Sequence, residues 1–220
     1  MQSPTEENYL KCIYKLSLKV EKKLSTNAIA QAMCTSAASV SDMLKRLDEK
    51  KLIKHEPYKG VTLTNNGRKS ALITIRKHRL WELYLVNKMN FGWHEVHELA
   101  EQLEHIQSDA LIDRINKLLG NPMYDPHGDP IPDCNGEICY KEYLPLRDAA
   151  IGNYKLVGVK NHDPNFLKYL SERKLTIGSL IQLVAIDEMG KCIHIKISGL
   201  SKLLLLSHEV ATGLLIEKVK

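Results

Sequence analysis

Two groups of histidine and glutamate residues at helical spacing constrain this chain most. The first group is the pair His78 and Glu82, four residues apart. The second group consists of His97, Glu101, Glu104 and His105. On an α-helix, which turns about 100° per residue, the second group falls within an arc of about 100°. Two facing helices would then bring three imidazoles and three carboxylates together, as a divalent-cation site requires and ordinary packing does not. Nitrogen and oxygen donors without thiolate suit Mn(II), Fe(II), Co(II) or Ni(II) better than a structural zinc ion.

The composition indicates an ordinary globular protein of the cytoplasm. Hydrophobic residues make up 44% of the 220 residues, and the longest apolar run, Leu203 to Leu206, is far too short to cross a membrane. The N-terminal residues show no basic stretch followed by an apolar one, so we expect no signal peptide. Five widely spread cysteines argue against a disulfide framework and favour a reducing compartment. We therefore expect a cytoplasmic protein without a membrane partner.

The positive charge is concentrated in the N-terminal third. Residues 1–69 contain 13 basic and 7 acidic side chains, whereas residues 70–220 contain 18 basic and 19 acidic ones. An excess of basic residues confined to one module is typical of nucleic-acid binding, although a solvated lysine-rich face would give the same count.

The order of elements in this basic third predicts a winged helix-turn-helix. Apolar residues at helical spacing predict helices over 5–19, 25–33 and 37–50, and two short strands over 52–56 and 61–64 enclose a turn with a glycine. In this motif the second helix of the pair enters the major groove and the hairpin contacts the backbone or minor groove. A helical hairpin with a solvated face is the simpler alternative. The residues expected to contact DNA are Thr35, Ser36, Ala38, Ser39, Ser41, Asp42, Lys45, Arg46, Tyr58 and Lys59.

The rest of the chain divides into a helical part and a β part. Helices are predicted over 64–88, 94–106 and 108–119, followed by an irregular, proline-rich segment over 121–136. Short apolar or alternating runs over 143–220 predict a small β-barrel with one helix over 164–173. The expected fold is thus mainly α with a small β domain. We expect a DNA-binding domain over 1–70, a helical metal-binding and dimerisation domain over 71–140, and a β domain over 141–220.

Several motifs, in order along nearly the whole chain, resemble one known family. They lie at residues 9–14, 40–43, 58–64, 76–82, 104–105 and 128–132. The chain is similar there to the iron- and manganese-dependent repressors of the diphtheria toxin repressor and manganese transport regulator type. The resemblance implies a DNA-binding homodimer, and it implies that the C-terminal part is the SH3-like domain of the longer members.

The resemblance also implies two metal sites per subunit. His78, Glu82 and His97 match an ancillary site, which family members complete from the SH3-like domain. The residues that align with those completing ligands are His162 and Asn165, with Asp163 between them as a substitute. Arg79 matches the Arg of a neighbouring anion site, whose Ser and Asn partners align with Asp125 and Asp129.

Glu101, Glu104 and His105 match the regulatory site, whose last ligand comes from the first helix. Iron-responsive members carry Cys at the position of Glu101 and manganese-responsive members carry Glu, which favours Mn(II) here and leaves Fe(II) as the alternative. The first helix departs from the family. Asn8 stands where members have Met or Asp, and Lys11 replaces a second carboxylate.

The function implied by this resemblance is metal-dependent repression of metal-uptake genes at a pseudo-palindromic operator. Two other classes remain as alternatives. One is a constitutive DNA-binding protein with a structural metal. The other is a di-metal helical enzyme, but its paired Glu-x-x-His motifs are missing, so we expect no catalytic residues. Cys134 and Cys139, near His127, have poor spacing for a zinc site and are expected to be ordinary small residues.

Overall fold

The computed structural model describes residues 2–19, 23–56, 60–200 and 202–219. These residues form two compact units, which are described separately. The first unit comprises Met1–Trp81, Ala100–Leu118 and Ile131–Cys139, and the second comprises Glu82–Leu99, Leu119–Pro130 and Tyr140–Lys220. Among the described residues, every helix is too short or too polar to span a lipid bilayer.

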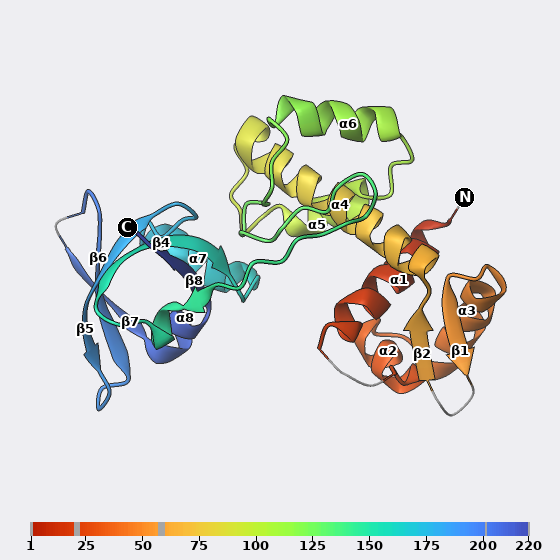
Figure 1. The fold of residues 1–220 in the computed structure, drawn as a ribbon, viewed down its shortest axis with the longest axis horizontal. Helices are drawn as coiled ribbons and strands as arrows, with labels where there is room; N and C mark the ends of the chain where they lie inside the picture. The colour runs from red at the N-terminus through yellow and green to blue at the C-terminus, as the bar shows by residue number, and fades with distance from the viewer. Residues whose placement is uncertain (1, 20–22, 57–59, 201, 220) are drawn as a thin grey trace. The chain divides into compact units, whose positions relative to one another are not determined.

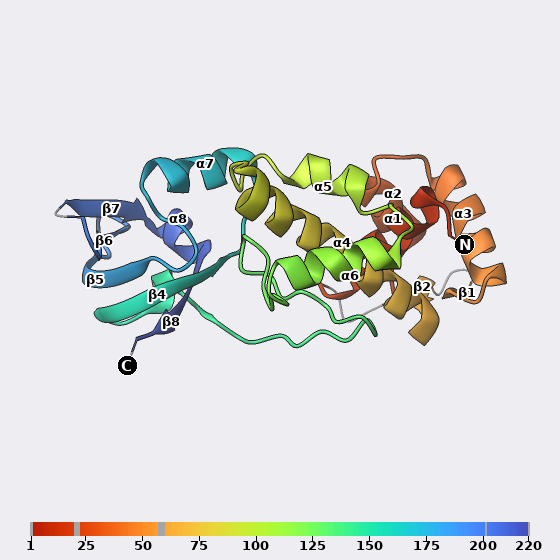
Figure 2. The ribbon, with the colours of Figure 1, turned by 90° about the horizontal axis from the view of Figure 1, so that it is seen from above.

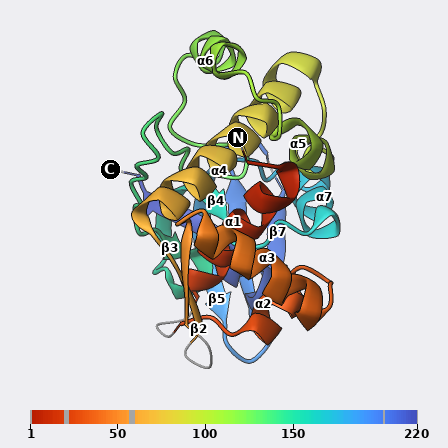
Figure 3. The same cartoon turned by 90° about the vertical axis from the view of Figure 1, so that its right-hand side faces the viewer.

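The first unit contains the expected winged helix-turn-helix (Figures 1 and 3). Its elements are α1 (Pro4–Ser17), α2 (Thr26–Ala32), α3 (Ala37–Glu49), β1 (Ile53–Glu56), β2 (Gly60–Leu63), the first part of α4 (Asn65–Met89) and α6 (Asp109–Leu118). Serine side chains start the first three helices, because Ser3, Ser25 and Ser36 each accept a hydrogen bond from a backbone N–H of the first turn. These caps lie within a few residues of the predicted helix starts.

One apolar core joins these helices. Leu10 and Ile13 of α1 are fully buried with Val40, Leu44 and Leu47 of α3. Burial of each such side chain contributes about 1.5–3 kcal/mol. Because α1 and α3 share this core, the position of α1 is coupled to the position of α3.

The second unit is built on a six-stranded antiparallel sheet with the order β3-β8-β4-β5-β6-β7 (Figures 1 and 2). The strands are β3 (Leu144–Pro145), β4 (Gly152–Val159), β5 (Leu180–Asp187), β6 (Cys192–Ile197), β7 (Leu203–Ser207) and β8 (Leu214–Lys218). A short 3-10 helix, η1 (Leu146–Asp148), follows β3, and two helices, α7 (Pro164–Glu172) and α8 (His208–Thr212), accompany the sheet. Apolar side chains from α7, including Leu167 and Leu170, are buried in the core of the sheet.

The sheet confirms the predicted β domain and adds elements that periodicity missed. The strands at 156–159, 180–184, 193–197 and 203–206 and the helix at 164–173 are present. The strand β8 pairs with β4, about 60 residues away in sequence, and such a long-range partner leaves no local signal. Among the described residues β3 and β7 end the hydrogen-bonded order, so the sheet does not close into a barrel.

One helix is shorter than the sequence predicts, and the difference changes the site. The helix expected over 94–106 is α5 (His97–Leu103), and Glu104 and His105 lie in the turn that follows it. Ser108 then caps α6 by accepting the backbone N–H of Leu111. The prediction that His97, Glu101, Glu104 and His105 lie on one helix is therefore wrong for Glu104 and His105, which lie in a turn.

Candidate metal centre and nucleic-acid interface

Seven side chains of the first unit form what we call the junction cluster. They are Glu7, Asn8 and Lys11 of α1, His78 of α4, Glu101 of α5, and Glu104 and His105 of the turn after α5. Glu7 and Lys11 are four residues apart and Asn8 and Lys11 three, so the helical period places all three on one side of α1. The cluster therefore joins the DNA-binding region to residues from the helical part.

Glu104 lies at the centre of this cluster and is completely buried. Its Oε2 is 2.6 Å from Nδ1 of His78, and its Oε1 accepts a hydrogen bond from Nζ of Lys11. Nε2 of His105 is 3.8 Å from the same Oε1. A buried carboxylate is costly unless it is paired, so these nitrogen groups account for the position of Glu104.

Glu101 shares the ammonium group of Lys11 with Glu104. Lys11 Nζ is 2.7 Å from Glu101 Oε2, and His78 Nδ1 is 3.8 Å from Glu101 Oε1. Burial raises the pKa of Glu101, but the hydrogen bond and positive charge of Lys11 outweigh it, and the net pKa lies below its ordinary value. Glu101 is thus held as an anion beside Glu104.

The first helix contributes a carboxylate that the sequence analysis missed. Glu7 is buried, its Oε2 is 2.6 Å from Nδ1 of His105, and its Oε1 accepts a hydrogen bond of 2.8 Å from Gln107. The available signal was the spacing of Glu7 and Lys11, one helical turn apart. The turn after α5 brings His105 to this position.

The junction cluster fits a divalent cation. The side-chain oxygen of Asn8 is buried without a hydrogen-bond partner among the described residues, although a buried amide oxygen ordinarily has one. It lies on the same helix face as Glu7, in a cluster that also offers Glu104 and His105. Carboxylate and amide oxygens with one imidazole are donors suited to Mn(II) and Fe(II).

A second cluster lies in the second unit, and it was only partly foreseen. Nδ1 of His127 is 3.6 Å from Oε2 of Glu82 and 4.0 Å from Oδ1 of Asp125, and all three residues are buried. Their donor atoms lie within 4.8 Å of one another, close enough to share one metal ion. We call these three residues the Glu82 cluster.

The loop at 125–129 holds His127 in place. Asp125 Oδ1 accepts backbone hydrogen bonds of 2.8 Å from His127 and 3.0 Å from Asp129. Gly128 has φ of +89°, and a Cβ there would lie 2.2 Å from the carbonyl oxygen of Val157, so only glycine lets the loop approach β4 this closely. Nε2 of His127 lies 2.8 Å from the carbonyl oxygen of Trp93, which accepts its N–H and leaves Nδ1 directed at the carboxylates.

The charge on His127 is set by its carboxylate neighbours. Burial alone lowers its pKa, but the hydrogen bond and charge of Glu82 and the charge of Asp125 raise the pKa to about 9. Without a metal ion, His127 is therefore protonated at neutral pH. Metal binding at Nδ1 has to displace that proton.

His78 and Glu82, which the resemblance places in one site, lie one helical turn apart on α4. His78 contacts Glu104 and Glu101 in the first unit, whereas Glu82 contacts His127 in the second. His97 lies beside Glu82, with 3.4 Å between Nδ1 and Oε1. The pattern Asp125-Pro-His127-Gly-Asp129, with three donor side chains in five residues, was the sequence signal for the cluster.

His162, Asp163 and Asn165 were expected to complete the ancillary site, and the structure gives them different positions. The ring of His162 lies 5.1 Å from the ring of His127, and its Nε2 is 4.0 Å from Oδ2 of Asp129. Burial lowers the pKa of His162, against the raising effect of Asp129, so His162 is neutral at pH 7. Asp163 caps α7 by accepting the backbone N–H groups of Asn165 and Phe166, and Asn165 itself is exposed. His162 is therefore the expected completing residue whose contacts place it beside His127.

The exposed face of α3 carries the residues expected to contact DNA. Val40, Leu44 and Leu47 point into the core, and the other face exposes Ala38, Ser39, Asp42, Lys45 and Arg46, with Ser41 partly exposed. Thr35 and the N-cap residue Ser36 are exposed just before the helix. Asp42, whose negative charge opposes phosphate binding, lies 3.9 Å from Lys45 Nζ. Tyr58 and Lys59 of the hairpin turn lie outside the described residues.

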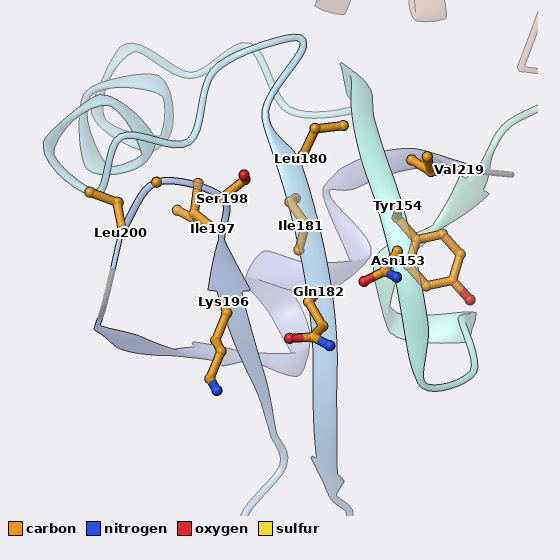
Figure 4. Close-up of a pocket in the computed structure, with 11 residues that line it drawn as sticks. Asn153, Tyr154, Leu180, Ile181, Gln182, Lys196, Ile197, Ser198, Leu200 and Val219 are labelled. Carbon is orange, nitrogen blue, oxygen red and sulfur yellow. The ribbon is translucent and has the colours of Figure 1, made fainter.

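A hollow on the sheet of the second unit has a different chemistry. It has a volume of about 470 Å³ and lies over β4, β5 and β6 (Figure 4). Its lining includes Tyr154, Leu180, Ile197 and Leu200, and Lys196 is its charged side chain. Because the lining lacks carboxylates and histidines, the hollow is not a candidate metal centre.

Family models match the first three fifths of the chain. Residues 1–61 match the model described as iron dependent repressor, N-terminal DNA binding domain. Residues 64–133 match the model described as iron dependent repressor, metal binding and dimerisation domain. The two matched regions together contain the exposed face of α3 and the whole junction cluster.

Curated proteins with similar sequences are iron-dependent repressors. The iron-dependent repressor IdeR of Mycobacterium tuberculosis is 36% identical over 128 residues, which are 58% of this chain and 55% of that protein. The diphtheria toxin repressor of Corynebacterium glutamicum is 34% identical over 134 residues, 61% of this chain and 58% of that protein. The chain thus spans little more than half the length of these relatives.

Solved structures match over nearly the whole chain. A manganese-dependent transcriptional repressor in complex with manganese has a TM-score of 0.80 and 32% identity, covering 97% of this chain and all of the other. The manganese regulator SloR has a TM-score of 0.69 and 35% identity, covering 99% of this chain and all of the other. ScaR with bound Zn²⁺ has a TM-score of 0.71 and 33% identity, covering 97% of this chain and 99% of the other. The chain belongs to the family of iron- and manganese-dependent transcriptional repressors.

Proposed function

We propose that this protein is a metal-dependent DNA-binding repressor that responds to Mn(II), with Fe(II) as the alternative ion. The observation that carries the proposal is the junction cluster, in which Glu7 of the DNA-binding region contacts His105 and the neighbouring Asn8 has a buried side-chain oxygen without a partner among the described residues. An ion bound there has ligands on both sides of the junction between α1 and the turn after α5. Its binding therefore favours one position of α1.

Metal binding at α1 would affect DNA binding by α3, because the two helices share one apolar core. Glu7 and Asn8 would hold the ion, together with Glu104 and His105, and the bound ion would supply positive charge between these carboxylates. Fixing α1 also fixes α3, because Leu10 and the α3 residue Leu44 are buried in one core. Metal acts as an effector only if it binds the DNA-competent arrangement more tightly.

The same proposal includes a second metal site, a dimer and an operator. The Glu82 cluster, with His97 and His162 beside it, is the second site in each subunit. We propose a cytoplasmic homodimer whose two α3 helices read half-sites about one helical turn apart in a pseudo-palindromic operator. The regulated genes would encode proteins for metal uptake. The chain would divide into three domains, with boundaries at about residues 70 and 140.

Manganese is proposed ahead of iron because of the donor atoms. Glu7, Asn8 and Glu104 offer oxygen donors and His105 an imidazole nitrogen, and the described residues of the junction cluster include no sulfur donor. Hard oxygen ligands suit Mn(II), whereas thiolate or thioether ligands favour softer ions.

The direct test is DNA binding by the full chain at increasing metal concentrations. Fluorescence anisotropy with a labelled fragment of its own promoter would be measured in chelator, and then with Mn(II), Fe(II) or Zn(II) under reducing conditions. We expect Mn(II) to increase affinity by about 10- to 100-fold, the usual size of an allosteric coupling. Affinity that no metal changes, together with a melting temperature that metal raises, would instead indicate a constitutive DNA-binding protein with a structural metal.

Arg46→Ala is expected to weaken DNA binding by removing a phosphate contact from the exposed face of α3. Affinity should fall on all sequences alike, and the slope of log affinity against log salt concentration should decrease by about 1. The control is Lys168→Ala, which removes an exposed positive charge from α7. An unchanged salt slope for Arg46→Ala would exclude Arg46 from the interface.

A further inference from the structure

Lys11 has a position in the junction cluster that an ordinary surface lysine does not have. Its side chain is 7% exposed, and its ammonium group donates hydrogen bonds to both Glu101 and Glu104. These carboxylates come from α5 and the following turn, 90 and 93 residues away in sequence. Lys11 therefore joins α1 to the end of α5 without an ion between them.

The two carboxylates need a positive charge between them. Glu104 is completely buried and Glu101 is about one third exposed, so their repulsion is only weakly screened by water. The ammonium group meets this need without any ion from solution. Each carboxylate turns one oxygen towards the Lys11 ammonium group, Oε2 of Glu101 and Oε1 of Glu104.

The remaining donors form a separate half of the cluster. Glu7 contacts His105, and Asn8, the next residue of α1, has a buried side-chain oxygen without a partner among the described residues. Glu104 borders both halves, because its Oε1 accepts from Lys11 and is 3.8 Å from Nε2 of His105. One divalent ion can be held by these donors, but a second ion between Glu101 and Glu104 would meet the Lys11 ammonium.

We propose that the Lys11 ammonium group is a built-in cation that takes the place of a metal ion between Glu101 and Glu104. The junction cluster then accepts one divalent ion only, and α1 is tied to α5 before that ion binds. This inference rests on the proposed metal response of the same cluster. Beyond the proposed function, it states how many ions the junction cluster binds. It also states that Lys11 connects α1 to α5 before any ion binds.

The test is to convert the built-in cation into a ligand. In Lys11→Glu a third carboxylate faces Glu101 and Glu104 beside His78, which completes donors for a second ion. Equilibrium dialysis of the full chain against Mn(II), followed by metal analysis, should show one more ion per subunit than in the wild type. Electron paramagnetic resonance should show a spin-coupled Mn(II) pair in Lys11→Glu and none in the wild type.

Lys50→Glu is the matched control. Lys50 also pairs with a carboxylate of α1, at 2.7 Å from Oε1 of Glu6, but the pair lies outside the junction cluster. The substitution makes the same change in net charge and should leave the number of bound ions unchanged. An equal number of ions in wild type and Lys11→Glu, or a spin-coupled pair in the wild type, would overturn the proposal.

A stability measurement gives a second readout if Lys11→Glu folds only with metal. Lys11→Met should lower the melting temperature of the metal-free protein by about 5–15 °C, because it leaves two carboxylates without their cation. Lys11→Arg should restore most of this loss. If Lys11→Met melts like the wild type in chelator, the ammonium group has no such role.

These measurements separate this inference from the proposed function. Counting ions requires no DNA, so a second ion in Lys11→Glu supports the built-in cation even if metal does not change DNA affinity. Conversely, metal-dependent DNA binding with an unchanged ion count would keep the proposed function and remove the built-in cation.

Discussion

Replacing Glu104 with glutamine is expected to abolish the metal-dependent part of DNA binding. Glu104 is completely buried and is the one carboxylate that borders both halves of the junction cluster among the described residues. Glutamine keeps the shape but not the negative charge. The loss of one member of a buried charge pair costs about 3–5 kcal/mol, which corresponds to a decrease in metal affinity of about 10²- to 10⁴-fold.

The measurement combines calorimetric Mn(II) binding with anisotropy on promoter DNA. Glu98→Gln is the matched control, because Glu98 is an exposed carboxylate on α5, the helix that precedes Glu104. We expect Glu98→Gln to keep both the metal affinity and the DNA response. If Glu104→Gln keeps full metal-dependent DNA binding, the junction cluster is not the regulatory site. The melting temperature in chelator shows separately how much of the effect is loss of folding.

The second large effect is a loss of stability in the metal-free protein as the pH rises from 6.5 to 9. The pKa of His127 is about 9 in the fold, against 6.5 for an ordinary histidine, so the folded state binds the proton more tightly. The resulting stability is fully present below pH 6.5 and is lost as the pH rises through about 9. A shift of this size corresponds to about 3 kcal/mol.

Denaturation of the metal-free chain at pH 6, 7.5 and 9.5, together with NMR titration of the His127 ring, measures this effect. Glu82→Gln should lower the pKa of His127 and flatten the dependence, because Glu82 supplies the largest favourable interaction with the charged ring. A His127 ring that titrates near 6.5 in the wild type would contradict the expectation. Excess Mn(II) should reverse the trend, since metal binding at Nδ1 becomes easier as the proton is lost.

Local sequence patterns predicted the elements around the site well. The caps and apolar periodicity of α1, α2 and α3 depend on residues within a few positions, so they can be read without the fold. The helix expected over 94–106 was predicted too long, because periodicity continues past Leu103 although the chain turns there. That turn, and not a helical face, directs His105 to Glu7.

Donor residues were recognised more readily than their grouping. His78, Glu82, Glu101, Glu104 and His105 were identified from spacing, but the contacts of His78 with Glu104 and of Glu82 with His127 were not predicted. Glu7 and His127 were missed, because each becomes a candidate ligand only through a contact with a distant segment. In the same way, the resemblance only aligned Asp125 with a position of the family's anion site, and the fold places its carboxylate beside His127.

The sequence by itself determined the class of this protein: a basic winged helix followed by histidines and carboxylates at helical spacing. These features are local, and helical period and residue chemistry are enough to read them. Only the tertiary structure decided which donors share a site. Contacts such as Lys11 with Glu104 and Glu82 with His127 join segments 93 and 45 residues apart, and no local rule encodes them. The sequence alone showed Lys11 only as a residue that cannot bind a metal ion. The structure shows that its ammonium group pairs with the carboxylates of Glu101 and Glu104.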